Sequence, residues 1–255
     1  GKHVLVEKPL ASSAAHCEEL VAEAEQRGLV LLVDHTFLYT GAVQKIRDVV
    51  ASGELGDLYY YDSVRVNLGL FQPDVDVIWD LAVHDLAIMD YVMPGKPTAV
   101  QAVGIKHVQG QQTNMAYLTL SFPNNVLAHL HVNWLAPVKI RRTLIGGTKK
   151  MIVYDDLEPS EKIRIYDKGV TVEDINSPDG REIYSMLAYR RSGDMHAPKV
   201  SLAEALGAES SHFVACIRGE EKPLTDGAQG LRLVRILEAA GKSLAGNGEW
   251  FELDL

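Results

Sequence analysis

Three residues of the chain have types and positions suited to acid–base chemistry: Lys8, Asp80 and His84. Lys8 belongs to Glu7-Lys8-Pro9, which directly follows a short apolar run typical of a buried strand, and a lysine there can stabilise a deprotonated hydroxyl. Asp80 and His84 are four residues apart in a predicted helix, so their side chains lie on one face. A carboxylate beside an imidazole can orient it and raise its basicity. His84 is therefore a candidate general acid or base near neutral pH.

Each of these features also has a structural explanation. Lys8 can belong to a solvated ion pair before a turn. Asp80 can be a favourable carboxylate in the first turn of a helix, with His84 a satisfied interior histidine. The same pair could supply two metal ligands, but no clear third or fourth ligand is visible, so we expect no metal. His129 and His131 share one strand face and could bind metal, although a face toward solvent or substrate is the simpler interpretation.

The first 34 residues predict a strand, a helix and a second strand. The predicted elements are a strand at Val4–Val6, a helix capped by Ser12 or Ser13 and ended near Gly28, and a strand at Leu29–Val33. Such a βαβ unit has a right-handed crossover, and ligands bind outside the carboxyl ends of its strands. This places Lys8 at the edge of the sheet where ligands are expected to bind. The chain opens without Met on an interior-type strand, so we expect further sequence upstream.

The rest of the chain predicts a large, mainly antiparallel sheet with a few helices. The predicted strands are Leu58–Val66, Thr98–His107, Ala116–Phe122, Val126–Trp134, Val138–Ile145, Lys149–Tyr154 and Ile163–Tyr166. The predicted helices are Ala42–Ala51, Trp79–Val92, Leu202–Arg218 and Ala228–Leu244, with a surface loop at 168–200. The fold class is thus an α/β unit over 1–34 followed by an α+β domain over 35–255 with an open sheet.

Composition narrows the classes of partner. The chain has 255 residues and a net charge of −9, with no basic stripe, which argues against nucleic acid. Two cysteines, far apart and in no metal or redox spacing, favour a cytoplasmic location. No apolar run approaches the roughly 18 residues of a membrane span. Gly241-Lys242-Ser243 lacks the earlier glycine of a phosphate loop, and no dinucleotide fingerprint is present.

Taken together, these motifs resemble the Gfo/Idh/MocA family of oxidoreductases along essentially the whole chain. The resemblance rests on Gly1–Ala11 with its Glu7-Lys8-Pro9 motif, Gly53–Asp57, Asp80-x-x-x-His84-Asp85, Gly193-Asp194, Pro198 and Pro223–Gly227. It implies the end of a Rossmann domain followed by an α/β domain whose open sheet packs against another subunit, as a homodimer or homotetramer. It also implies NAD or NADP as cofactor, although the missing glycine-rich loop predicts weak or absent binding by this chain alone.

The resemblance further implies roles for individual residues. Lys8 would contact the reacting hydroxyl and the nicotinamide, His84 would move the proton, and Asp80 would orient His84 or the substrate. Glu7, Pro9 and His35 would form the rest of the cofactor wall. The substrate would be a sugar or nucleotide sugar, with a pocket lined by Tyr39, Asn67, Gln72, Trp79 and His196.

Two other functions compete with hydride transfer to a sugar. The missing cofactor fingerprint favours a catalytically inactive sugar-binding or oligomerisation module. The Asp80 and His84 pair is also compatible with a metal-dependent sugar isomerase or lyase.

Overall fold

The computed structural model describes most of the chain. The described residues are 1–69, 74–108, 112–168 and 193–255. The predicted surface loop at 168–200 lies mostly outside these ranges. Within them, Met195–His196 forms a short strand, β10, that pairs antiparallel with Tyr166 and Ile165. The prediction of a continuous loop is therefore wrong at its end, because two residues of extended backbone complete the edge of a sheet there.

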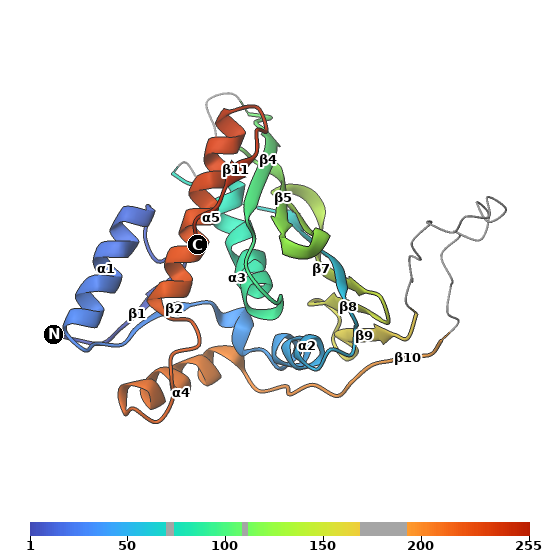
Figure 1. Ribbon diagram of the computed structural model, residues 1–255, viewed down its shortest axis with the longest axis horizontal. Coiled ribbons are helices and arrows are strands. Elements are labelled where there is room, and N and C mark those ends of the chain that lie inside the picture. The colour runs from blue at the N-terminus through green and yellow to red at the C-terminus, as the bar shows by residue number, and fades with distance from the viewer. Residues whose placement is uncertain (70–73, 109–111, 169–192) are drawn as a thin grey trace, which may run out of the picture.

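The first residues form the expected βαβ unit (Figure 1). Its elements are β1 (Val4–Glu7), α1 (Ala14–Gln26) and β2 (Leu31–Asp34), with the two strands paired in parallel. Ser13 caps α1 by accepting the backbone N–H of His16, and Gly28 follows the helix with φ of 61°, where glycine costs little. Both local predictions are confirmed.

A nine-stranded sheet dominates the remainder. In spatial order its strands are β10, β9 (Ile163–Tyr166), β8 (Met151–Asp155), β7 (Leu135–Gly147), β3 (Leu58–Leu68), β6 (Val126–Asn133), β5 (Met115–Phe122), β4 (Ala99–Ile105) and β11 (Phe251–Glu252). Among the described residues, only β3 and β6 of this sheet pair in parallel, and every other neighbouring pair is antiparallel. The predicted open and mainly antiparallel sheet is confirmed.

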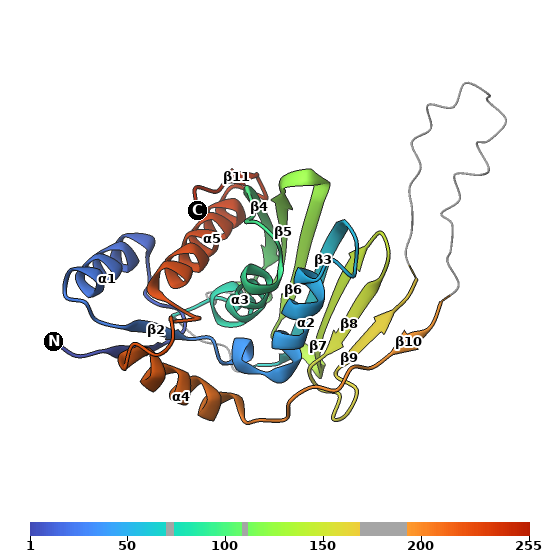
Figure 2. The same ribbon diagram turned by 60° about the horizontal axis from the view of Figure 1, so that its bottom comes forward.

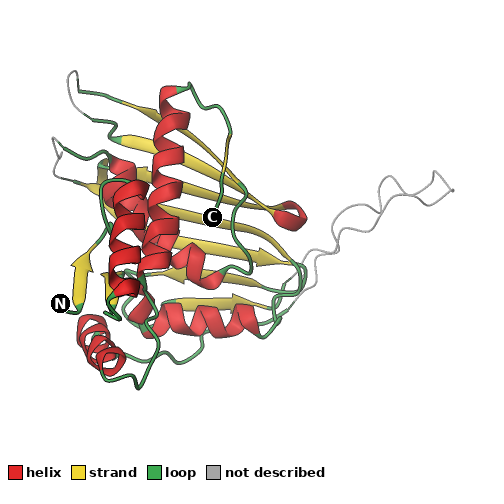
Figure 3. Ribbon diagram, turned by 60° about the vertical axis from the view of Figure 1, so that its left-hand side comes forward, coloured by secondary structure: helices red, strands yellow, loops and turns green. Residues whose placement is uncertain are grey.

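Helices cover one face of this sheet, and no described helix covers the other, which is called the open face below (Figures 2 and 3). The helical elements are η1 (Thr36–Tyr39), α2 (Gly41–Ala51), η2 (Ile78–Ala82), α3 (Val83–Val92), η3 (Pro123–Asn125), α4 (Ala205–Ile217) and α5 (Gly227–Ala245). Alternation along the strands fills the layer between sheet and helices: Ala128, Leu130 and Val132 are fully buried on one side of β6. The predicted fold class is confirmed.

The βαβ unit is tied to the C-terminal part of the chain. Cys17 of α1 and Val33 of β2 pack with Val234 of α5 in one apolar cluster. The backbone N–H of Val33 also donates to the carbonyl of Thr225 at 2.8 Å. Strand β1 is thereby held beside the helical layer of the large sheet. The domain division at residue 34 stays a prediction.

Within the described ranges, no helix is both long enough and apolar enough to cross a membrane.

Candidate active site

Lys8 and Asp80 meet at the carboxyl end of β1. The Lys8 ammonium donates to the backbone carbonyl of Asp80 at 2.9 Å and lies 3.5 Å from its carboxylate. The side chains are 20% and 34% exposed, so the pair borders solvent while its charges are partly shielded. The Lys8 ammonium is thus held at the end of a strand by a residue 72 positions away in the sequence. At this position it can donate a hydrogen bond to an oxygen atom of a bound ligand.

Trp134 holds the other side of the Asp80 carboxylate. Its indole Nε1 donates to Asp80 Oδ2 at 3.0 Å, and the side chain is 1% exposed at the end of β6. Trp134 is not among the residues that the sequence predicts for the site. The available signal was its type, because a buried tryptophan needs an acceptor for its N–H.

The segment that carries Asp80 is not a regular α-helix. Residues Ile78–Ala82 form a π-helical turn, and α3 begins only at Val83. A π turn bonds residue i to i+5, so the spacing argument for an α-helix does not apply across it. Among the described residues, Asp80 bonds Trp134 and Lys8, not His84. The predicted role of Asp80, to orient His84 or the substrate, stays a prediction, and no hydrogen bond between Asp80 and His84 supports its first form.

His84 lies among cations and an aromatic ring. Its ring packs edge-on against Phe37, with centroids 5.3 Å apart. Burial lowers the pKa of His84 well below its ordinary 6.5, and the positive charges of Arg65 and Lys8 lower it further. The imidazole is consequently neutral at pH 7 and can accept a proton.

An NMR titration of the His84 imidazole tests this environment. Its pKa is depressed, so the ring should remain neutral as the pH falls from about 8 to about 6. In the unfolded chain this histidine takes up a proton near pH 6.5, whereas in the folded chain it stays neutral. The free energy of unfolding should therefore decrease as the pH falls below about 6.5. Proton uptake by His84 between about pH 6 and 7 would contradict the prediction.

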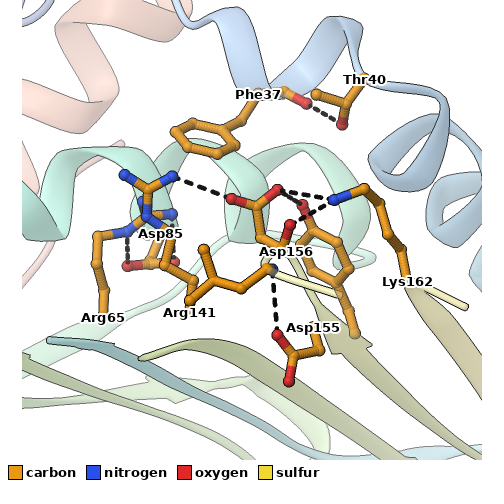
Figure 4. Close-up of polar contacts among 10 residues, drawn as sticks. Phe37, Thr40, Arg65, Asp85, Arg141, Asp155, Asp156 and Lys162 are labelled. Carbon is orange, nitrogen blue, oxygen red and sulfur yellow. Dashed lines mark hydrogen bonds and ion pairs between the residues drawn. The ribbon is translucent and has the colours of Figure 1, made fainter. Parts of the chain in front are cut away.

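A buried ion pair supports the floor of the site. Arg65 on β3 donates to both carboxylate oxygens of Asp85 on α3, at 2.7 and 3.1 Å, and both residues are 3% exposed (Figure 4). The Arg65 guanidinium also lies 4.6 Å from the ring centroid of Phe37. Arg65 was missed, yet it follows Tyr61 and Ser63 on the buried side of an alternating strand. A charged residue on the buried side of a strand indicates a buried residue of opposite charge, because an unpaired buried charge is costly.

The predicted cofactor wall is only partly enclosed. Glu7 is exposed at the end of β1, and the Lys8-Pro9 bond is cis. His35 is 2% exposed, and neither ring nitrogen has a hydrogen-bond partner among the described residues. Burial lowers its pKa to about 4, so it is neutral. Unpartnered buried nitrogens beside Lys8 fit a site completed by a polar ligand.

The predicted substrate residues do not all lie together. Trp79 adjoins Asp80, and Asn67 is half-buried near the end of β3. Tyr39 faces elsewhere: its hydroxyl is 3.2 Å from that of Thr225, and its ring packs on His212 of α4.

His196 is far from the site. It is exposed on β10, the strand that forms one edge of the sheet, whereas Trp134 ends β6 five strands away. At about 4.8 Å per strand, the two are separated by more than 20 Å. The prediction that His196 lines this pocket is wrong for a single chain, because sequence order says nothing of distance across a sheet. Gln72 lies outside the described residues.

Trp79 and Pro9, the chain neighbours of Asp80 and Lys8, border a cavity of about 510 Å³. Its lining residues are Pro9, Ala11, Ser12, Asp74, Val75, Asp76, Trp79 and Gln112. The Asp76 carboxylate accepts the backbone N–H groups of Ile78 and Trp79, which fixes the start of the π turn. Lys8, Asp80 and His84 are not among the residues that line this cavity.

The residues considered for metal binding serve other contacts. Among the described residues, no three His, Cys, Asp or Glu side chains form a metal-binding group. His129 and His131 both stack on Tyr117, and His129 Nδ1 lies 3.3 Å from Asp62.

Comparison with known proteins identifies the family. Residues 43–153 match the model of the GFO/IDH/MocA C-terminal domain, and residues 1–35 match the oxidoreductase family with an NAD-binding Rossmann fold. UDP-N-acetylglucosamine 3-dehydrogenase of Acidithiobacillus ferrooxidans is 29% identical over 238 residues, which is 92% of this chain and 68% of that protein. A dTDP-3,4-didehydro-2,6-dideoxy-alpha-D-glucose 3-reductase of Saccharopolyspora spinosa is 28% identical, covering 81% of this chain and 70% of the relative.

Solved structures agree on the fold. The crystal structure of the Acidithiobacillus ferrooxidans dehydrogenase superposes with a TM-score of 0.77 at 24% identity, covering 96% of this chain and 71% of that one. The WlbA dehydrogenase from Bordetella pertussis, in complex with NADH and UDP-GlcNAcA, gives 0.76 at 16% identity, covering 100% and 73%. The two family models together span more than half of the chain. On these matches and this architecture, the chain belongs to the Gfo/Idh/MocA family of oxidoreductases.

Proposed function

We propose that this chain forms the substrate side of a dehydrogenase that transfers a hydride between NAD or NADP and a hydroxyl-bearing carbon of a sugar or nucleotide sugar. The observation that carries the proposal is the Lys8–Asp80 contact beside a neutral, partly buried His84. Relatives named as a nucleotide-sugar dehydrogenase and a nucleotide-sugar reductase support this substrate class. They lend no support to the alternative of an inactive binding module.

The residues present fit the nicotinamide end of the cofactor. Glu7, Lys8 and Pro9 leave the end of β1 together, and His35 supplies two unpartnered buried nitrogens nearby. When bound, the nicotinamide supplies the hydride acceptor or donor. These side chains would hold and orient it next to the substrate.

The chain's own residues supply the acid–base part of the reaction. As a hydride leaves the sugar carbon, neutral His84 would take the proton of the attached hydroxyl, which leaves a carbonyl group. The Lys8 ammonium would donate a hydrogen bond to that oxygen and stabilise its growing negative charge. Asp80 would position Lys8, because its carboxylate is itself held by Trp134. In the reverse direction, protonated His84 would return the proton.

A coupled assay on the full-length protein tests the proposal. UDP-N-acetylglucosamine, dTDP-glucose and glucose are each offered with NAD or NADP, and formation of the reduced nicotinamide is followed. We expect turnover of at least one sugar, and a loss of about 10²- to 10⁴-fold in kcat for His84→Gln, since general-base catalysis contributes that much. Arg142→Gln, an exposed residue of β7, is the matched control. Absence of cofactor reduction with every sugar, or normal turnover by His84→Gln, contradicts the proposal.

We also propose that the open sheet face joins a second copy in a homodimer or homotetramer. Leu127 and Ile140 alternate with residues that face the helices, so both lie on the open face. They are 46% and 38% exposed. Apolar side chains on a broad sheet without a covering layer support a protein–protein contact.

A further inference from the structure

A cluster of charged side chains lies beside the proposed site, on the same face of the sheet (Figure 4). Arg141 of β7 donates to the Asp156 carboxylate at 3.0 Å, and Lys162 lies 3.9 Å from the same carboxylate. The hydroxyl of Tyr154 also donates to Asp156, at 3.1 Å. Burial raises the pKa of Tyr154, so this hydroxyl is neutral. Two cations thus share one carboxylate, and this group carries one surplus positive charge.

A third cation, Arg65, lies beside this group. Arg65 and Arg141 are directly paired residues of β3 and β7, so two guanidinium groups stand side by side. Like charges in such cross-strand positions are destabilising unless something compensates for them. Asp85 neutralises Arg65 with two hydrogen bonds, whereas Arg141 shares its carboxylate with Lys162. The uncompensated charge therefore belongs to Arg141 and Lys162.

Arg141 also retains unused hydrogen-bonding capacity. Its Nε is buried and has no partner among the described residues. Its side chain is 28% exposed, compared with 4% for Arg65, so Arg141 can be reached by a ligand and Arg65 cannot. A guanidinium carries five N–H donors in a planar fork that matches carboxylate and phosphate oxygens.

Arg141 and His84 both lie against the ring of Phe37. The ring of Phe37 lies 5.3 Å from that of His84 and 5.4 Å from the Arg141 guanidinium carbon. Arg141 is also among the cations that lower the pKa of His84. A sugar whose hydroxyl meets His84 can therefore place an exocyclic group at Arg141.

We infer that Arg141 binds a negatively charged substituent, a carboxylate or a phosphate, on the sugar whose hydroxyl lies at Lys8 and His84. The inference rests on the proposed function, because it names the class of sugar that this site prefers. Asp156 acts as a positioning residue, since it accepts one hydrogen bond from the guanidinium, and Tyr154 in turn donates to the Asp156 carboxylate. Lys162 strengthens the local positive field.

Ligand-observed NMR titration of the chain tests the inference without requiring turnover. Glucose, glucuronate and glucose 6-phosphate serve as probes at constant pH and ionic strength, so that a carboxylate and a phosphate are compared with a neutral sugar. We expect one anionic sugar to bind about tenfold or more tightly than glucose, as a charge-assisted hydrogen bond allows. Arg141→Gln should reduce its affinity to that of glucose, and Arg141→Lys should retain part of the advantage.

The neighbouring Arg142→Gln is the matched control. It removes the same charge from an exposed residue on the opposite face of β7, where Arg142 pairs with Asp155. Its affinities should equal those of the wild type. Equal binding of all three sugars, no measurable binding of any, or an anionic advantage that survives Arg141→Gln overturns the inference. Arg141-dependent binding without hydride transfer in the coupled assay would instead reject only the proposed function.

Discussion

Replacing Lys8 with methionine is expected to lower kcat/KM for sugar oxidation by about 10²- to 10³-fold, the usual effect of removing one donor to a developing oxyanion. Methionine keeps most of the length of the side chain and removes only the charge and the donor. Trp134 still donates to Asp80 in this variant, so the π turn should keep its position. Steady-state kinetics on the full-length protein, with thermal unfolding as a check of the fold, provide the measurement.

The matched control is Lys149→Met, at an exposed lysine in the turn between β7 and β8. This variant should retain wild-type kinetics. Recovery of part of the Lys8→Met activity by added methylammonium would identify the missing group as the ammonium. If Lys8→Met and Lys149→Met had the same kcat/KM, Lys8 would not take part in the reaction.

The second large effect is expected on stability. Asp85→Asn should lower the free energy of unfolding by about 3–5 kcal/mol, because it leaves the Arg65 charge buried without its counter-ion. Both partners are 3% exposed, so water cannot compensate the guanidinium. Urea unfolding followed by circular dichroism measures the change.

Two further variants separate this explanation from a general loss of packing. Asp155→Asn breaks the Arg142–Asp155 contact, in which the arginine is 53% exposed, and should cost less than about 1 kcal/mol. Arg65→Met combined with Asp85→Leu should recover most of the lost stability, since it removes both buried charges together. Equal costs for Asp85→Asn and Asp155→Asn would show that the buried pair has no special role.

These effects depend on contacts between segments that are distant in the sequence. Lys8 meets Asp80 across 72 residues, and Trp134 meets Asp80 across 54. Both contacts require β1 and the end of β6 to reach the same turn. Periodicity predicts each of these segments separately, but it carries no information on which strands become neighbours.

The sequence by itself determined the local elements and the candidate residue types. Alternating apolar residues predicted the strands of the large sheet, and Ser13 and Gly28 bounded the first helix because capping is a local interaction. The position of Lys8 after a buried strand was likewise visible, as was the histidine on the helix that follows β3.

Only the tertiary structure decided which of these residues act together. It joined Asp80 to Lys8 rather than to His84, because a π turn changes the direction of the side chains that follow it. It left His196 at a distant edge of the sheet and brought Arg141 beside Phe37 instead. The physical reason is that the direction of a side chain follows from the local backbone geometry, whereas the distance between two side chains depends on the order of the strands in the sheet. Nine strands can be arranged in many orders, and the local sequence pattern does not select one of them.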